Sequence, residues 1–172
     1  MKLRLLSVFA AVALVAACES TTEGTASTAG AGSMGGLNSG IAAVTTPSVA
    51  LQQEFEQAVG QDRVFFDFDK YAVRSNAKPV LMRWADWMKH HPQYPVTLEG
   101  HADERGTREY NLALGEKRAN AVKEFLAAHG VSSGQLTTIS YGKERPAVPG
   151  SNEAAWSQNR RAVATVGGGT AS

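Results

Sequence analysis

The sequence GHADERGTREYNLALGEKRA (residues 100–119) joins a strand-like segment to a helix-like one, and it decides the fold of this chain. Residues 96–101 begin with the alternation of apolar and polar side chains that is typical of a strand. From about residue 108 to residue 129 the apolar period becomes helical, and Gly130 follows as a natural left-handed cap. We therefore expect a strand, a glycine-flanked loop and a long helix.

One face of the expected helix carries an arginine among mostly apolar residues. The members of this face recur at spacings of three and four and are Leu114, Arg118, Val122, Phe125 and His129. A guanidinium on a core-facing stripe must be paired or must face a bound anion. Asp103 lies in the loop that precedes the helix, and we expect it to be the acid nearest to Arg118.

A carboxylate and a guanidinium held close together have two uses. They can form a structural salt bridge with each other, which the spacing alone favours. They can also bind a zwitterion, because the acid accepts an ammonium group while the planar guanidinium binds a carboxylate in bidentate fashion. From the residues alone, both uses remain open.

The rest of the domain alternates between strand and helix patterns. Helices are expected over residues 48–59, from an N-cap at Asn76 to a stop at His91-Pro92, and over 153–158; strands are expected over 63–68, 135–140 and 161–166. Because helices connect the strands, neighbouring strands should be parallel, with right-handed crossovers and with the helices packed on the sheet. About 105 residues are sufficient for one modest core.

The first seventeen residues have the pattern of an export signal. Lys2 and Arg4 precede an apolar run that, at about 1.5 Å per residue, is too short to span roughly 30 Å of hydrocarbon. The run ends in small residues directly before Cys18, which is the only cysteine and resembles the lipidated cysteine of a bacterial lipobox. We expect residues 1–17 to be a lipoprotein signal peptide, and Glu19 favours sorting to the outer membrane.

Residues 18–47 are rich in Gly, Ser, Thr and Ala and should form a flexible, lipid-anchored linker, because this composition cannot offset the entropy of ordering. The folded domain is expected over 48–166, and 167–172 should be a disordered tail. Removing residues 1–17 leaves 15 basic against 16 acidic residues. Such a near-neutral exported domain offers no electrostatic attraction for nucleic acid.

A glycan hydrolase is the main catalytic alternative. The carboxylates that could serve it are Asp67, Asp69, Glu99, Asp103 and Glu104. Asp67 and Glu99 alternate with strand core residues, so at least some of these carboxylates should face solvent. A hydrolase also needs one protonated carboxyl group, whereas the arginines of the loop lower the pKa of a neighbouring acid. The domain has no cysteine and no serine elbow, so we do not expect an enzyme.

Metal binding and protein binding are two non-catalytic roles that the chain could have. The histidines that could join Asp103 in a metal site are His90, His91 and His101, but their spacings match no standard site, so we expect no metal and no other cofactor. Aromatic anchors for a purely protein-interaction module would be Trp84, Trp87 and Trp156. Trp84 fits a helix core better, and the sequence does not locate such an interface.

Four motifs resemble the OmpA-like peptidoglycan-binding domains. They are VFFDFDKYAVRS (64–75), VTLEGHADERGTREYNLALGEKRANAVKEFL (96–126), ISYGKERPAV (139–148) and NEAAWSQNRRAV (152–163). They lie within a segment of about one hundred of the 172 residues (64–166) and follow the order of the family, most closely that of the lipoprotein members of the Tol–Pal system. The resemblance implies an α/β fold (an α+β sandwich), with a small mixed sheet in β-α-β-α-β order and helices packed on one face.

The resemblance also implies a ligand, namely the stem peptide of peptidoglycan, bound through the free end of meso-diaminopimelate. The recognition aspartate of the family falls on Asp103 and its recognition arginine on Arg118. The free end of this ligand carries one ammonium and one carboxylate group. The resemblance therefore favours a binding role for the pair over a purely structural salt bridge.

Four further positions match residues that line the same site in the family, and they are Asp69, Arg105, Asn111 and Leu114. Asp69 matches an acidic residue at the groove edge, and Arg105 can supply a second cation. Leu114 offers an apolar wall, although a plain core position would explain it equally well. Asn111 is expected to hold the loop through side-chain bonds to its backbone.

As a whole, the resemblance implies a lipoprotein anchored through Cys18 in the outer membrane, with its domain in the periplasm. It would connect this membrane to the cell wall and serve envelope integrity and cell division. Its expected partners are the peptidoglycan stem peptide, TolB and other Tol–Pal components. A cell-wall glycan hydrolase and a pure interaction module are the competing hypotheses.

Overall fold

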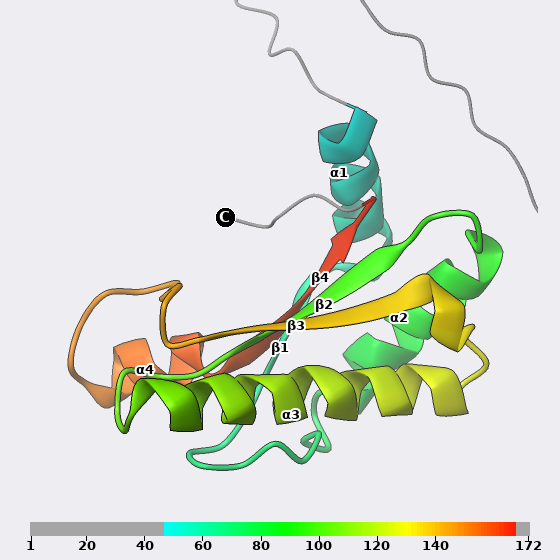
Figure 1. The fold of residues 1–172 in the computed structure, drawn as a ribbon. Coiled ribbons are helices and arrows are strands. Elements are labelled where there is room, and N and C mark those ends of the chain that lie inside the picture. The colour runs from blue at the N-terminus through cyan, green and yellow to red at the C-terminus, as the bar shows by residue number, and fades with distance from the viewer. Residues whose placement is uncertain (1–46, 168–172) are drawn as a thin grey trace, which may run out of the picture. The chain divides into compact units, whose positions relative to one another are not determined.

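The computed structural model describes residues 47–167, which form a four-stranded mixed sheet with packed helices (Figure 1). The strands lie in the order β1-β4-β2-β3 and are β1 (Arg63–Phe65), β2 (Val96–His101), β3 (Leu136–Gly142) and β4 (Arg161–Val166). The helices are α1 (Pro47–Val59), α2 (Lys78–His90), α3 (Arg108–Ala128) and α4 (Glu153–Asn159). The expected α/β class with a mixed sheet is confirmed.

The expectation of parallel neighbouring strands is correct for only one pair. β2 and β3, which α3 connects, are parallel, but β4 lies between β1 and β2 and is antiparallel to both. The chain between β3 and β4 forms a loop and the short α4, which lie beside the end of β3 rather than along the sheet (Figure 1). β4 therefore begins near the end of β3 and runs back.

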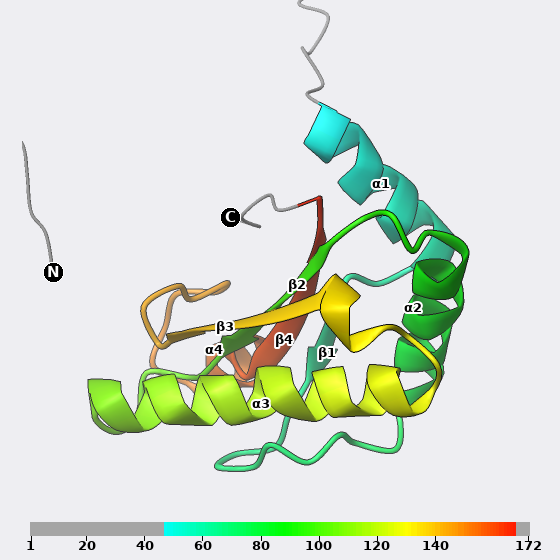
Figure 2. The same ribbon diagram turned by 45° about the vertical axis from the view of Figure 1, so that its right-hand side comes forward.

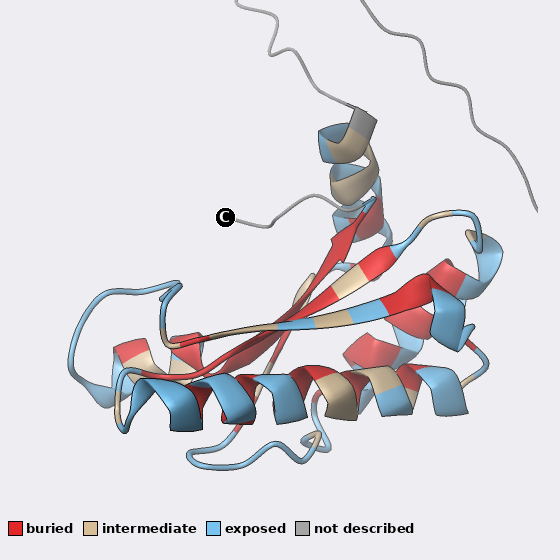
Figure 3. Ribbon diagram, viewed as in Figure 1, coloured by how far each residue is buried: buried red, intermediate tan, exposed pale blue. Residues whose placement is uncertain are grey.

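Helices α2 and α3 cover one face of the sheet, and α1 adds buried side chains to the same core (Figures 1 and 2). The strands β2 and β4 and the inner sides of these helices are mostly buried, whereas the edge strand β3 is partly exposed (Figure 3). The largest fully buried apolar side chains of the core are Phe55, Phe66, Leu81, Trp84 and Met88. Each such side chain contributes about 1.5–3 kcal/mol through the hydrophobic effect, which gives the site a rigid support.

Element boundaries differ slightly from the expected ones. The first strand ends at Phe65, because the amide of the next residue donates to the Arg160 carbonyl, outside β4 (2.9 Å). The second helix follows Ala77 rather than an N-cap at Asn76. Gly130 has the expected left-handed conformation, with a φ of 91°, directly after the end of α3.

Several expectations concern parts of the chain outside the described residues. These are the signal peptide (1–17), the lipidation site at Cys18, the linker up to residue 46 and the tail from residue 168. Between residues 47 and 167, no helix has the length and apolar composition needed to cross a membrane.

Candidate functional site

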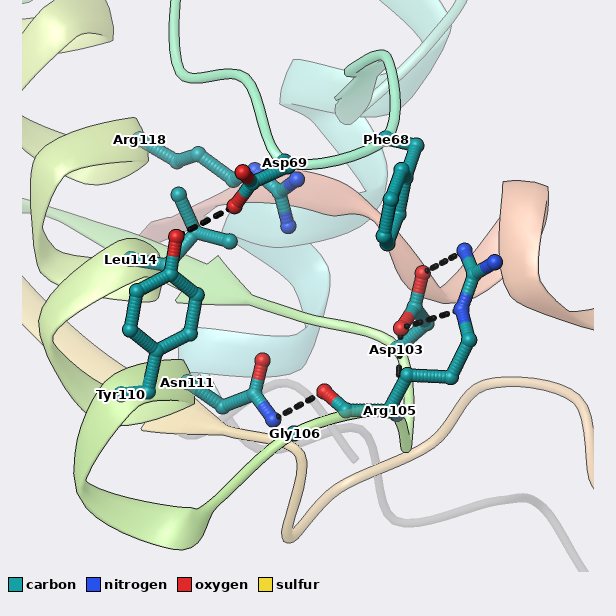
Figure 4. Close-up of a pocket in the computed structure, with 9 residues that line it drawn as sticks. All are labelled: Phe68, Asp69, Asp103, Arg105, Gly106, Tyr110, Asn111, Leu114 and Arg118. Carbon is teal, nitrogen blue, oxygen red and sulfur yellow. Dashed lines mark hydrogen bonds and ion pairs between the residues drawn. The ribbon is translucent and has the colours of Figure 1, made fainter.

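A pocket of about 220 Å³ opens between the β1–α2 segment, the β2–α3 loop and the first turns of α3 (Figure 4). Its lining residues are Phe68, Asp69, Asp103, Arg105, Gly106, Tyr110, Asn111, Leu114 and Arg118. All six residues expected at the site from the sequence therefore line one pocket. Leu114 is 8% exposed and forms part of the apolar wall.

The β2–α3 loop is fixed by two polar side chains. Thr107 caps α3, because its hydroxyl accepts a hydrogen bond from the Tyr110 amide (3.2 Å). The Asn111 side chain donates to the carbonyls of Arg105 (2.8 Å) and Thr107 (3.1 Å). The expected role of Asn111 in holding this loop is confirmed, and the loop presents Asp103 and Arg105 to the pocket.

Arg118 is 1% exposed and is held by backbone carbonyls rather than by a carboxylate. Its Nε donates to Lys70 (2.9 Å), its Nη1 to His101 (2.7 Å) and its Nη2 to Asp67 (3.2 Å). A structural salt bridge with Asp103, the alternative that spacing alone favours, is absent from the described hydrogen bonds and ion pairs. Burial lowers the pKa of Arg118 to about 10, and the nearby negative charge of Asp103 opposes this shift.

Asp69 lies in the turn that Arg118 holds. Its φ of 57° is in the left-handed region, and it is the one non-glycine residue with positive φ in the part of the chain that the structure describes. Its carboxylate accepts a short hydrogen bond from the Tyr110 hydroxyl, which raises the pKa of Tyr110. Figure 4 shows this pair at the side of the pocket formed by α3.

Asp103 is 4% exposed and has two arginine partners. Arg105 donates to it from the backbone amide (3.2 Å), from Nε (3.2 Å) and from Nη2 (2.6 Å), and Arg160 donates from Nη1 (3.3 Å). Burial favours the neutral acid, but the hydrogen bonds from Arg105 and Arg160 outweigh this effect. The pKa of Asp103 therefore lies below its usual range, and the carboxylate is ionised at neutral pH.

Arg105 stands between two aromatic rings at the mouth of the pocket. Its guanidinium carbon lies 4.0 Å from the ring centre of Phe68 and 4.0 Å from that of Trp156. Cation–π contacts on both faces hold the guanidinium in one orientation. The side chain remains 31% exposed, so it can reach a ligand.

Sequence reasoning missed Arg160, Phe68 and Tyr110. Arg160 belongs to the last of the four motifs, but its partner Asp103 lies 57 residues earlier. Phe68 stands between two acids and is 57% exposed, which a core pattern cannot indicate. Tyr110 follows the loop on the exposed side of α3, and only its contact with Asp69 reveals a role.

The hydrolase hypothesis receives no support from this geometry. A general acid needs a raised pKa, whereas the pKa of Asp103 is lowered. Asp67 faces solvent as expected, with 53% of its side chain exposed. The expectation that Glu99 could also face solvent is wrong, because it is 1% exposed and bonds to the Thr165 hydroxyl (3.3 Å) on neighbouring β4.

The metal-site hypothesis also finds no support, and two of the three possible aromatic anchors are buried. No group of three metal-binding side chains occurs within residues 47–167. His90 and His91 interact instead with carbonyl groups one helical turn earlier. Trp84 is fully buried and Trp87 is 7% exposed, so neither can anchor a partner protein. Trp156 is partly exposed beside Arg105, so it stays a candidate contact residue.

Comparison with known proteins shows the family to which the chain belongs. The model of the OmpA family matches residues 65–160, which is more than half of the chain. The chain belongs to the OmpA family. The expected family is therefore confirmed, and because the OmpA-like fold is non-enzymatic, the chain is not an enzyme.

Relatives named peptidoglycan-associated lipoprotein match most of the chain. That of Agrobacterium fabrum is 52% identical over 136 residues, which cover 79% of this chain and 75% of the relative. That of Haemophilus influenzae is 44% identical over 159 residues, which cover 92% of this chain and 94% of the relative. The second match includes most of the N-terminal region as well as the OmpA-like domain.

Solved structures agree with this assignment. The crystal structure of the peptidoglycan-associated lipoprotein from Burkholderia pseudomallei has a TM-score of 0.61 and 46% identity, covering 62% of this chain and 91% of that chain. The crystal structure of the C-terminal domain of Helicobacter pylori MotB has a TM-score of 0.58 and 22% identity, covering 62% of this chain and 84% of that chain. The second similarity concerns the fold alone.

Proposed function

We propose that this OmpA family member is a lipoprotein that binds peptidoglycan non-covalently through the free end of meso-diaminopimelate in the stem peptide. The observation that carries this proposal is a small pocket in which two carboxylates and two guanidinium groups meet. The free end of the ligand has one ammonium and one carboxylate group, so the pocket offers a partner for each. The names of the relatives support peptidoglycan as the ligand.

The ammonium group of the ligand would bind on the acidic side of the pocket. Asp69 is the better placed of the two acids, because Tyr110 supplies the one hydrogen bond described for its carboxylate. Both oxygens of Asp103 already accept hydrogen bonds from arginines. Asp103 would therefore contribute chiefly its negative charge, unless Arg105 turns towards the ligand and frees one of its oxygens.

The carboxylate of the ligand would bind on the cationic side. A guanidinium has five N–H groups, and the carbonyls of Lys70, His101 and Asp67 use three of those of Arg118. The remaining N–H groups of Arg118, together with the exposed Arg105, would bind the carboxylate. Leu114 would contact the methylene groups between the two charged ends.

The N-terminal region would turn this binding domain into a tether. In this proposal Cys18 carries lipid in the outer membrane, residues 18–47 form the flexible linker, and the domain holds the wall from the periplasm. TolB and other Tol–Pal components are proposed as partners of the folded domain, with roles in envelope integrity and cell division. A flexible linker raises the local concentration of the domain at the wall without any new contact.

Calorimetric titration of the full-length protein with two synthetic stem tripeptides tests the proposed ligand. One peptide ends in meso-diaminopimelate, and the matched peptide has lysine there, which keeps the ammonium group but lacks the second carboxylate. Losing one charge-assisted contact should weaken binding about 10- to 100-fold. Equal affinities for the two peptides would contradict recognition of the zwitterionic end.

A further inference from the structure

Two arginines stand next to each other where α4 meets β4, and their side chains have different surroundings. Arg160 is 5% exposed and Arg161 is 7% exposed. Arg160 reaches Asp103 in the wall of the pocket (3.3 Å). Arg161 donates instead to the carbonyl of Arg145 (3.2 Å) and does not line the pocket. Arg160 therefore contacts a pocket residue, whereas Arg161 is an equally buried arginine that makes no such contact and can serve as its control.

Arg160 connects three segments of the chain through three different nitrogen atoms. Its Nε donates to the carbonyl of Phe66 (3.1 Å), directly after β1. Its Nη1 donates to Asp103, and its Nη2 donates to Glu153 in the first turn of α4. Because a guanidinium is rigid and planar, these bonds fix the Asp103 carboxylate relative to β1 and α4.

Arg105, the other partner of Asp103, is less suited to this task. Its side chain is 31% exposed, whereas that of Arg160 is 6% exposed. Arg105 comes from the same loop as Asp103 and lines the pocket mouth, so a ligand carboxylate can draw it away. Arg160 is buried and lies outside the residues that line the pocket, so a ligand in the pocket does not compete for its contact with Asp103.

We propose that Arg160 is a positioning residue that holds the Asp103 carboxylate in place, so that its effect on ligand affinity acts through Asp103. The effect on affinity rests on the proposed function, whereas the effect on Asp103 itself does not. The lowered pKa of Asp103 agrees with this role, since burial alone would raise it and the hydrogen bonds of Arg105 and Arg160 reverse that effect.

The test follows the titration of Asp103 and the binding of the diaminopimelate tripeptide in the same full-length proteins. Carboxyl carbon NMR shifts report the pKa of Asp103 without any ligand. Arg160→Met removes the guanidinium, and Arg161→Met is the matched control for loss of a buried arginine from this segment. A double-mutant cycle with Asp103→Asn then shows whether Arg160 acts through Asp103.

We expect Arg160→Met to raise the pKa of Asp103 and to weaken tripeptide binding about tenfold, which corresponds to one charge-assisted bond. In the Asp103→Asn protein, the same change should leave affinity unaltered. Arg161→Met should change neither quantity. An unchanged pKa of Asp103, or an equal loss of affinity in both members of the cycle, would overturn the proposal.

Two further outcomes are decisive. If Arg160→Met does not fold, Arg160→Lys and Arg160→Gln are measured in the same way, because each removes the rigid guanidinium that reaches Asp103 but keeps a polar donor in the buried segment. A raised pKa of Asp103 in these variants supports positioning, and an unchanged one overturns it. If the parent protein does not bind the tripeptide, the proposed function fails, while the titration of Asp103 still decides the role of Arg160.

Discussion

Arg118 organises the backbone around the pocket. Its bonds to the carbonyls of Asp67 and Lys70 close the turn on both sides of Asp69. A left-handed φ costs a non-glycine residue roughly 1–3 kcal/mol and persists only where the surroundings fix it. The same arginine also donates to the end of β2, so it joins this turn to the loop that carries Asp103. The position of Asp69 thus depends on Arg118, which lies 49 positions later in the sequence.

The variant Asp69→Gly should lose ligand affinity without losing stability. Glycine adopts a φ of 57° without strain, and this gain offsets its larger entropy in the unfolded chain. We expect the free energy of unfolding to stay within about 1 kcal/mol of the parent. Tripeptide binding should weaken about tenfold or more, since the ammonium group loses its free carboxylate.

Arg118→Ala, unlike Asp69→Gly, should lower both the free energy of unfolding and the affinity for the tripeptide. It leaves three carbonyls without a charge-assisted donor, so urea unfolding should show a loss of about 2–4 kcal/mol together with weaker binding. An Asp69→Gly protein that binds like the parent would contradict a direct role of Asp69. Lys117→Ala, a change at the exposed neighbouring position, is the control for Arg118→Ala.

At this scale the sequence predicts which residues meet but not how they are paired. Spacing and family resemblance bring Asp103 and Arg118 to one pocket, as the structure confirms. The structural salt bridge that spacing alone favours does not form between them, and the carbonyl acceptors of Arg118 leave no mark in the side-chain pattern. The contact between Asp103 and Arg160 joins distant segments, so local spacing cannot reveal it.

Among the elements, the crossing of β2 and α3 decides how closely the helix approaches the sheet. Gly100 and Gly115 face each other there: a Cβ built on Gly100 would lie 1.8 Å from the Gly115 carbonyl oxygen. A Cβ on Gly115 would lie 2.3 Å from the Ser140 hydroxyl and 2.8 Å from the Gly100 carbonyl oxygen. Both positions require glycine because the two backbones are in close contact.

Gly115→Ala should therefore destabilise the domain although alanine is the better helix former. Overpacking of this kind costs about 1–3 kcal/mol, which exceeds the roughly 1 kcal/mol that alanine gains in a helix. Thermal and urea unfolding of the full-length protein measure the difference. Gly134→Ala is the control, since the nearest atom to its Cβ lies at 3.7 Å. A Gly115→Ala protein as stable as the parent would contradict this account, because it would show that α3 and β2 can move apart at no cost.

The sequence predicts the elements better than their arrangement. Periodicity and caps place all four helices within the described region, and α3 agrees with expectation to within one residue at each end. The place of β4 between β1 and β2 depends on long-range pairing, which strand patterns do not encode. The burial of Glu99 is equally invisible in the strand pattern, because its partner Thr165 lies 66 residues later on the neighbouring strand β4.

For the whole molecule, the proposed function joins a binding domain to a membrane through a linker. The chain is nearly neutral, with 17 basic and 16 acidic residues, so electrostatic attraction to an anionic surface cannot replace a lipid anchor. A lipid anchor at Cys18 would keep the domain near the wall, whereas binding to the stem peptide would need only the pocket. Membrane attachment and wall binding can therefore be separated by mutation.

Cys18→Ala should release the protein from membranes and leave its affinity for peptidoglycan unchanged. Several acyl chains hold a protein firmly, and their loss removes the only anchor that we propose. Membrane fractionation after a high-salt wash, followed by binding of the soluble protein to purified sacculi, measures both effects. A Cys18→Ala protein that still remains with the membranes would contradict the lipid anchor.

The central claim is that the pocket recognises the zwitterionic end of meso-diaminopimelate in the cell wall. Its most direct test is sedimentation of the full-length protein with purified sacculi that contain meso-diaminopimelate and with sacculi that have lysine at that position. We expect at least about tenfold weaker binding to the lysine-containing sacculi, and release from the first kind by the free diaminopimelate tripeptide. Equal sedimentation with both kinds of sacculi, unaffected by the tripeptide, would contradict the claim.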